Sequence, residues 1–162
     1  MTHDDSDADT TDTEHQARRA AFTAAVQART GIDEAMIQRL VHAFYGRVRA
    51  DAMLGPIFAE RITDWGPHLD RMCAFWSSVV LMTGRYHGRP MPKHVVLPVE
   101  GTHFDRWLEL FRDTAREECP PVAAALFAEK AQAIAESLEM GVAMFRGQSL
   151  AKGERLGGPA EA

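Results

Sequence analysis

The chain has 162 residues, a length typical of one domain, and its 46% hydrophobic and 25% charged residues are ordinary for a globular protein. This composition excludes a wholly disordered chain and a coiled coil. The formal net charge is −5, but residues 1–14 hold six acidic residues and no Lys or Arg, so the remainder is close to neutral. A near-neutral body has no electrostatic footprint for nucleic acid, and we expect no such partner.

The sequence also bears on membranes and on redox chemistry. No apolar run approaches the ~20 residues that a membrane span needs, and the basic and apolar regions of a secretory signal are not seen. Two cysteines, Cys73 and Cys119, are too few for a disulfide scaffold or a four-cysteine zinc site. We therefore expect no membrane partner and a cytoplasmic location.

The first third of the chain predicts a tail and two helices. Residues 1–14 are expected to form a disordered acidic tail, and residues 15–30 an accessory helix with a weak apolar stripe. A helix from about residue 32 to Asp51 has a strong stripe, with Asp33 placed to assist its start. The stripe consists of Ile32, Met36, Ile37, Leu40, Val41, Phe44, Tyr45 and Val48.

The middle of the chain predicts a central helix followed by an irregular segment. Ile57 and Phe58 are expected on a short connection, and Thr63 or Asp64 is expected to cap a helix that ends by Gly84. That helix is apolar over more than half its circumference. Residues 85–101 are rich in Gly and Pro and allow one or two helical turns at most, and such segments often carry function.

Two more helices complete the predicted fold. Thr102 and Asp105 resemble a capping box, and Pro120-Pro121 ends one helix and starts the last. We expect residues 31–146 to form one all-α domain and residues 147–162 a flexible C-terminal tail. The inward side chains expected on these helices are Phe104, Trp107, Leu108, Phe111, Val122, Leu126, Phe127, Ile134, Leu138, Val142 and Phe145.

Four side chains are candidates for chemistry. His68 lies on the apolar face of the central helix and is either a satisfied boundary histidine or a donor facing a ligand. His94 lies in the irregular segment, where it is either a surface residue or an axial ligand of haem iron. Tyr45 and Trp107 are buried by pattern, so their donors need partners, either backbone carbonyls or a ligand in a shared cavity.

Three kinds of metal site compete for these histidines. A zinc site of His87, His94 and His103 matches no common ligand spacing. A di-iron bundle needs Glu-x-x-His pairs on facing helices, and none is present. Haem needs one axial histidine, an apolar slot and a few distal donors, all of which the chain supplies.

Four segments in order resemble the truncated haemoglobins, specifically their third group. They are FYGRVRADAMLGPIF at 44–58, WGPHLDRMCAFWSSV at 65–79, GRYHGRPMPKH at 84–94 and HFDRWLELF at 103–111. The glycine pairs typical of the first two groups are missing from the body. The resemblance implies a truncated globin, a 2-on-2 helical sandwich around haem b.

The resemblance also implies roles for individual residues. His94 matches the proximal iron ligand, and Phe58 matches the phenylalanine that stacks on the haem. The polar residues that surround a bound ligand on the distal side of the haem in this family match Tyr45, His68 and Trp107. The expected cofactor-binding set is completed by Arg71, Met72, Phe75, Trp76, Tyr86 and Lys93.

What the resemblance implies about activity is broad. The first reading is a haem protein that binds dioxygen, nitric oxide or carbon monoxide and acts as an oxygen carrier or reservoir. The alternative is a haem enzyme for nitric oxide dioxygenation or peroxide chemistry, which needs an external reductase because the chain has no reductase domain. A sensor or interaction protein ranks last, since no output domain accompanies the globin.

Overall fold

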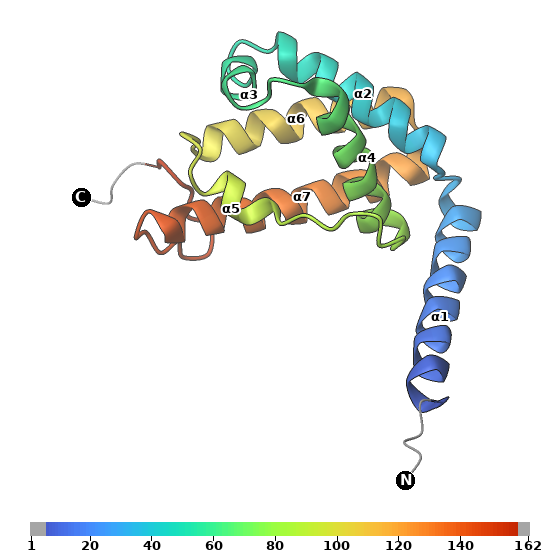
Figure 1. The fold of residues 1–162 in the computed structure, drawn as a ribbon. Coiled ribbons are helices and arrows are strands. Elements are labelled where there is room, and N and C mark those ends of the chain that lie inside the picture. Colours follow the sequence, from blue (N-terminus) through green and yellow to red (C-terminus); the bar gives the residue numbers. More distant parts are fainter. Residues whose placement is uncertain (1–5, 159–162) are drawn as a thin grey trace.

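The computed structural model describes residues 6–158, and the regular structure within them is entirely helical (Figure 1). This confirms the predicted all-α class. The helices are α1 (Ser6–Thr30), α2 (Glu34–Ala50), α3 (Gly55–Arg61), α4 (Trp65–Leu81), α5 (Pro90–His94), α6 (Gly101–Glu118) and α7 (Pro121–Phe145).

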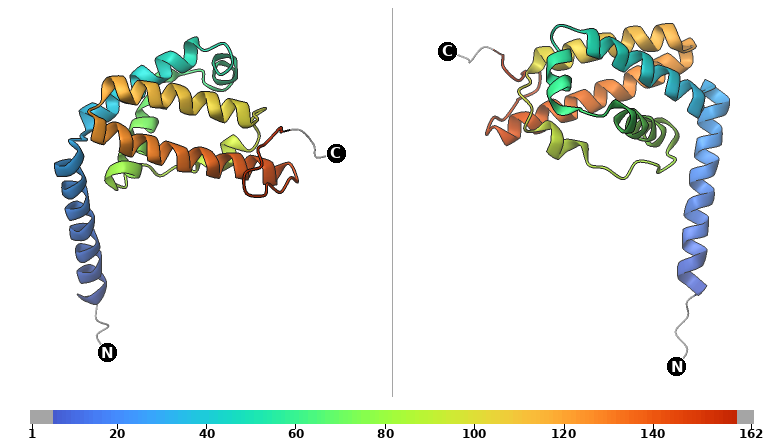
Figure 2. Two further views of the ribbon diagram at one scale, coloured as in Figure 1. Left: turned by 180° about the vertical axis from the view of Figure 1, so that it is seen from behind. Right: turned by 45° about the horizontal axis from the view of Figure 1, so that its top comes forward.

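Four long helices form the body in two pairs. Contacts join α2 to α4 and α6 to α7, and α2 also packs across α6 (Figure 2). This is the expected 2-on-2 arrangement. All eight residues of the predicted stripe from Ile32 to Val48 are buried, so the period of 3.6 residues locates this part of the core correctly.

Local chemistry explains where α2 and α3 begin. The Asp33 carboxylate accepts a hydrogen bond from the Met36 amide at 2.8 Å and caps α2. Ile57 and Phe58 lie on the short helix α3, so the prediction of a mere connection there is wrong. Gly55 starts this helix, and a Cβ at that position would lie 2.8 Å from the Arg49 carbonyl oxygen. Only glycine allows the two backbones to approach so closely.

Helix α4 has a broad apolar face whose residues are buried to different depths. It begins after Asp64, whose side chain forms no capping hydrogen bond, and it ends at Met82 in the left-handed region with φ of 54°. Trp76, Val80 and Leu81 are buried in the core. Partial burial is found for Leu69, Met72, Phe75 and Val79.

The segment between α4 and α6 is irregular, as expected, and contains only the five-residue helix α5. Pro90 occupies the first turn of α5, where its missing N–H costs little. Met91 rests on Gly141 of α7, where any Cβ would collide with the Met91 side chain. The small residue on α7 therefore gives α5 its seat.

Two details of α6 and α7 differ from prediction. Helix α6 begins at Gly101 rather than after Thr102, and the Glu100 amide donates to His103 Nδ1 at 3.0 Å. Val122 and Phe145 are 55% and 63% exposed, although both were expected to face inward. The buried side of α7 consists mostly of alanines, because small side chains let it lie close against α6.

Near both ends of the described residues, the structure has helix or tertiary contacts where the composition predicts disorder. Residues 6–14, expected to be disordered, form the first part of α1, and the rest of the acidic tail lies outside the described residues. Acidic side chains near a helix N-terminus stabilise the helix through its dipole, and this effect depends on position rather than on composition. In the C-terminal tail, expected to be flexible, Leu156 is 2% exposed and Arg155 contacts Glu139 and Asp105.

Candidate functional site

His94 ends α5, and its ring is held by the backbone of the same helix. His94 Nδ1–H donates to the Pro90 carbonyl oxygen at 2.7 Å. A carbonyl only accepts, so this bond places a proton on Nδ1. Metal-ligating histidines commonly make such a bond through one ring nitrogen and bind the metal through the other.

Tyr45 lies at the centre of a cluster of rings. Its ring centroid is 5.2 Å from that of His68, 5.9 Å from Phe58 and 5.9 Å from Trp65. Burial, and secondarily the nearby Cys73 thiol, raise the pKa of Tyr45 above its usual value. The phenol therefore keeps its proton, and Tyr45 is a donor across the physiological pH range.

His68 carries a buried ring nitrogen without a partner. Within residues 6–158, Nε2 of His68 is the buried side-chain nitrogen that forms no hydrogen bond. Burial lowers the His68 pKa to about 4, with further contributions from the positive charges of Arg71 and Lys93. The ring is therefore neutral at pH 7, and its unpartnered nitrogen suits a ligand that the protein chain does not supply.

The same electrostatic effect relates α4 to α5. Lys93 lies on α5 directly before His94, yet its positive charge lowers the pKa of His68 on α4. Arg71 and Lys93 are both exposed, and the described part of the chain contains no salt bridge to either. Two free cations thus flank the region between the two histidine-bearing helices.

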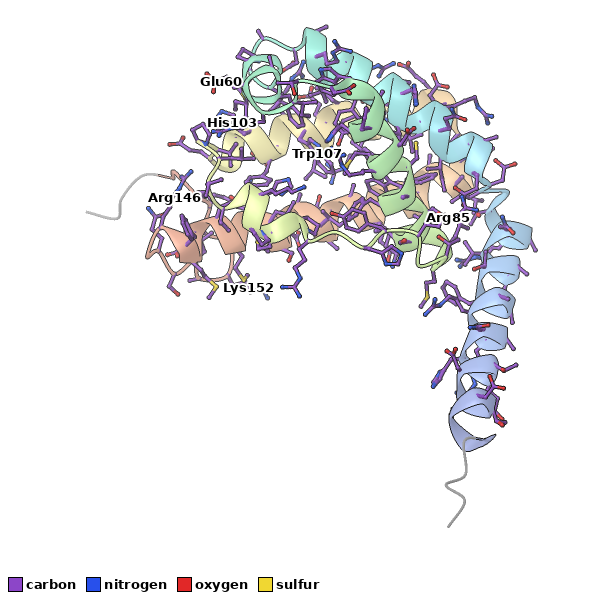
Figure 3. All side chains as sticks on the ribbon, viewed as in Figure 1. Glu60, Arg85, His103, Trp107, Arg146 and Lys152 are labelled. Carbon is purple, nitrogen blue, oxygen red and sulfur yellow. The ribbon has the colours of Figure 1, made fainter. Side chains whose placement is uncertain are left out.

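Trp107 and Trp76 belong to one aromatic stack. Phe111 lies between them, parallel to Trp107 at 5.5 Å and to Trp76 at 4.7 Å. Trp107 is half-buried and lies on the inner side of α6 (Figure 3), and none of the described residues accepts a hydrogen bond from its indole N–H. Trp76 is 2% exposed and is fully packed by Phe75, Phe111 and Phe127, so its role in this structure is core packing.

The remaining predicted contacts lie around the same region. Met72 and Phe75 present partly buried apolar surface on α4, and Phe58 does so on α3. Tyr86 packs its ring edge-on against Phe75 at 5.2 Å, and its amide donates to Ser78 Oγ at 2.9 Å. Helices α6 and α7 carry partly buried apolar side chains of their own, namely Leu110, Leu126, Ile134 and Leu138.

These features test whether haem fits. A histidine held through Nδ1 suits iron binding through Nε2, and the apolar surface on several helices suits the haem ring. The unpartnered nitrogen of His68 suits a bound ligand, and Arg71 and Lys93 suit the propionates. A zinc site fits poorly, because within residues 6–158 no three histidine, cysteine or carboxylate side chains converge, and His103 accepts from the Glu100 amide.

Trp65 also belongs to this region, although it was not among the site residues predicted from the sequence. Trp65 stacks on Phe58 at 6.5 Å and meets His68 edge-on at 5.5 Å. The Arg49 guanidinium covers the Trp65 ring, 4.4 Å from its centroid. The signal was its position three residues before His68, which places both on one helical face.

Fold and site together define a globin. The family model for bacterial-like globins matches residues 28–140, and the chain belongs to that family. Within it, the chain is a group III truncated haemoglobin, the same group that the segments at 44–58, 65–79, 84–94 and 103–111 resemble. Globins bind small ligands through haem, and that general function applies here.

Individual relatives agree with this placement. The group 3 truncated hemoglobin ctb of Campylobacter jejuni is 36% identical over 51% of this chain and 69% of its own length. The crystal structure of a group III truncated hemoglobin from the same species superposes with a TM-score of 0.63 at 30% identity, covering 76% of this chain and 95% of that one. The group 2 truncated hemoglobin YjbI of Bacillus subtilis is 27% identical over 51% of this chain and 64% of its own length.

Among the helices of residues 6–158, none combines the length and the apolar character that crossing a bilayer requires.

Proposed function

We propose that this globin holds haem b through His94 Nε2 and retains dioxygen beside Tyr45, Trp107 and His68. The observation that carries the proposal is the His94 Nδ1–H bond to the Pro90 carbonyl, because it leaves Nε2 free for iron. A bound haem supplies an iron atom with one position for a histidine and another for a diatomic ligand.

The chain's own residues then determine how a ligand is held. Tyr45 keeps its proton because burial raises the pKa of its hydroxyl, and Trp107 N–H has no acceptor among the described residues. Both groups are therefore available as donors to a polar diatomic ligand. In a site that excludes water, each hydrogen bond contributes about 1–3 kcal/mol to retention.

His68 supplies a third polar group in a different state. Because its pKa is lowered to about 4, the ring reaches the ligand region neutral and can either donate or accept through Nε2. Arg71, Tyr86 and Lys93 are proposed to contact the propionates, and Phe58, Met72 and Phe75 to contact the haem ring, whereas Trp76 stays in the core.

The same donors favour a second candidate function. Hydrogen bonds to a diatomic ligand polarise it, which supports nitric oxide dioxygenation or peroxide chemistry as well as retention. Nitric oxide and carbon monoxide are proposed as further ligands. Turnover needs electrons from an external reductase, and nitric oxide consumption in the presence of a reductase separates this function from simple binding.

Oxygen dissociation from a Tyr45→Phe variant tests the retention proposal. We expect the dissociation rate to rise about 5- to 150-fold, since one hydrogen bond of roughly 1–3 kcal/mol is lost while the ring remains. His42→Ala, on the exposed face of the same helix, is the matched control and should match the wild type. An unchanged rate for Tyr45→Phe would rule out retention by this hydroxyl.

A further inference from the structure

The chain that follows α7 contacts the turn directly after His94. Arg146 Nη2 donates to the Leu97 carbonyl oxygen at 2.7 Å, and the Leu97 amide donates to the His94 carbonyl oxygen at 3.0 Å. Figure 3 labels Arg146 just beyond the end of α7. Since Pro90 holds the His94 ring from the other side, the backbone is tied both before and after this residue.

A second anchor lies at the far end of the same segment. Arg155 Nη2 donates to the Gly101 carbonyl oxygen at 2.9 Å, and the Gly101 amide donates to the Leu156 carbonyl oxygen at 2.8 Å. Arg155 Nε also donates to Glu139 at 2.9 Å, and the Leu156 amide donates to the same carboxylate at 3.0 Å. Glu139 is 7% exposed, so this buried carboxylate fixes the C-terminal chain to α7.

The helix that carries His94 needs such support. It has only five residues, and a single helical turn is unstable on its own because nucleation is costly. Its described contacts with a long helix are with α7, where Met91 rests on Gly141. The orientation of His94 therefore depends on tertiary contacts rather than on helix propensity.

We propose that Arg146 is a positioning residue for His94: by holding Leu97 it fixes the turn that sets the imidazole's orientation, while Arg155 and Leu156 anchor the far end at Gly101. The inference rests on the proposed role of His94 as iron ligand. It gives a function to the C-terminal residues 146–156 that neither composition nor the family match over residues 28–140 assigns.

Amide hydrogen exchange tests the contact without haem. In the apo-protein, Arg146→Ala should speed exchange of the Leu97 amide about tenfold or more, because a charged hydrogen bond to its turn is lost. Arg146→Lys should restore most of the protection. Arg112→Ala is the matched control. The Arg112 guanidinium on α6 donates a hydrogen bond to the Gln132 side chain on α7 rather than to the turn after His94. Equal exchange in Arg146→Ala and wild type would overturn the proposal.

The iron–histidine stretching band of the ferrous haem protein, measured by resonance Raman, tests positioning itself. We expect this band to shift and broaden in Arg146→Ala, to return towards the wild-type position in Arg146→Lys, and to be unchanged in Arg112→Ala. Faster exchange with an unaltered band would show that Arg146 is merely structural and would overturn the positioning role. If the wild type lacks the band, or keeps it in His94→Ala, the proposed function fails as well, whereas the exchange result still reports on the Arg146 contact.

Discussion

At the scale of single residues, protonation states decide what the site can do. The Tyr45 pKa is raised and the His68 pKa is lowered to about 4, chiefly because both groups are buried. Both side chains are therefore uncharged at pH 7. Two neutral side chains can form hydrogen bonds with a neutral diatomic ligand without placing a full charge beside a bound haem.

The His68 shift makes a prediction about stability. Its folded-state pKa of about 4 lies below the ordinary value of 6.5, so between these pH values the unfolded chain binds a proton that the folded chain does not. The free energy of unfolding of the apo-protein should therefore decrease as pH falls from 6.5 to 4, with this contribution fully present above 6.5.

Urea denaturation across this pH range provides the measurement. His68→Leu should decrease less in stability than the wild type over the same interval, because the shifted group has been removed. His42→Leu, on the exposed face of α2, serves as the control and should keep the wild-type slope. Parallel pH profiles for His68→Leu and wild type would contradict the burial effect assigned to His68.

Sequence alone identified most of these residues but not their states. Tyr45, His68, His94 and Trp107 were selected by pattern and by resemblance, and the structure places them on four different helices. The hydrogen bond from His94 to Pro90 and the unpartnered Nε2 of His68 depend on three-dimensional geometry. Trp65 was overlooked because a large aromatic residue in an apolar stripe resembles ordinary core.

At the scale of helices, apolar periodicity and helix ends differ in how well they can be predicted. The α2 stripe is buried throughout, since a long run of spaced apolar residues averages over local exceptions. The start of α6 was misplaced because Thr102 and Asp105 matched a capping pattern, whereas Glu100 and His103 form the contact. Capping patterns are short and recur by chance, so competing residues are hard to rank.

The two ends of α1 should contribute differently to stability. Residues 9–21 are exposed, whereas Val26 and Thr30 are buried and the Thr23 hydroxyl donates to the Leu81 carbonyl. Deleting residues 1–16 should change the free energy of unfolding by no more than about 0.5 kcal/mol, since exposed positions contribute little.

Val26→Ala should instead destabilise by about 1 kcal/mol or more, because it removes buried methyl groups. Guanidinium denaturation of the two variants beside the wild type gives the comparison. A large loss from the deletion, with little effect of Val26→Ala, would show that the acidic half of α1 packs against the body in solution.

At the scale of the whole molecule, the helical core is buried, but one apolar region remains partly exposed to solvent. The core of α2, α6 and α7 is densely buried, but α3 and α4 retain partly exposed apolar side chains near the candidate site, such as Phe58 and Met72. A flat apolar group that covers this surface would stabilise the folded state by binding it preferentially.

Haem addition should therefore raise the melting temperature of the apo-protein. A haem concentration about 100 times the dissociation constant adds roughly 2.7 kcal/mol to the free energy of unfolding. Differential scanning calorimetry of the apo-protein with and without haem measures the change, and His94→Ala should show a smaller increase. An increase of equal size in both proteins would mean that haem binds without the histidine.

The central claim is that His94 binds haem iron, and absorption spectra of the purified protein test it most directly. Ferric, ferrous and carbon monoxide-treated samples of the wild type should each show a strong haem band, and in His94→Ala that band should be lost or shifted. A wild-type protein that stays colourless after haem addition, or identical spectra for wild type and His94→Ala, would contradict the account.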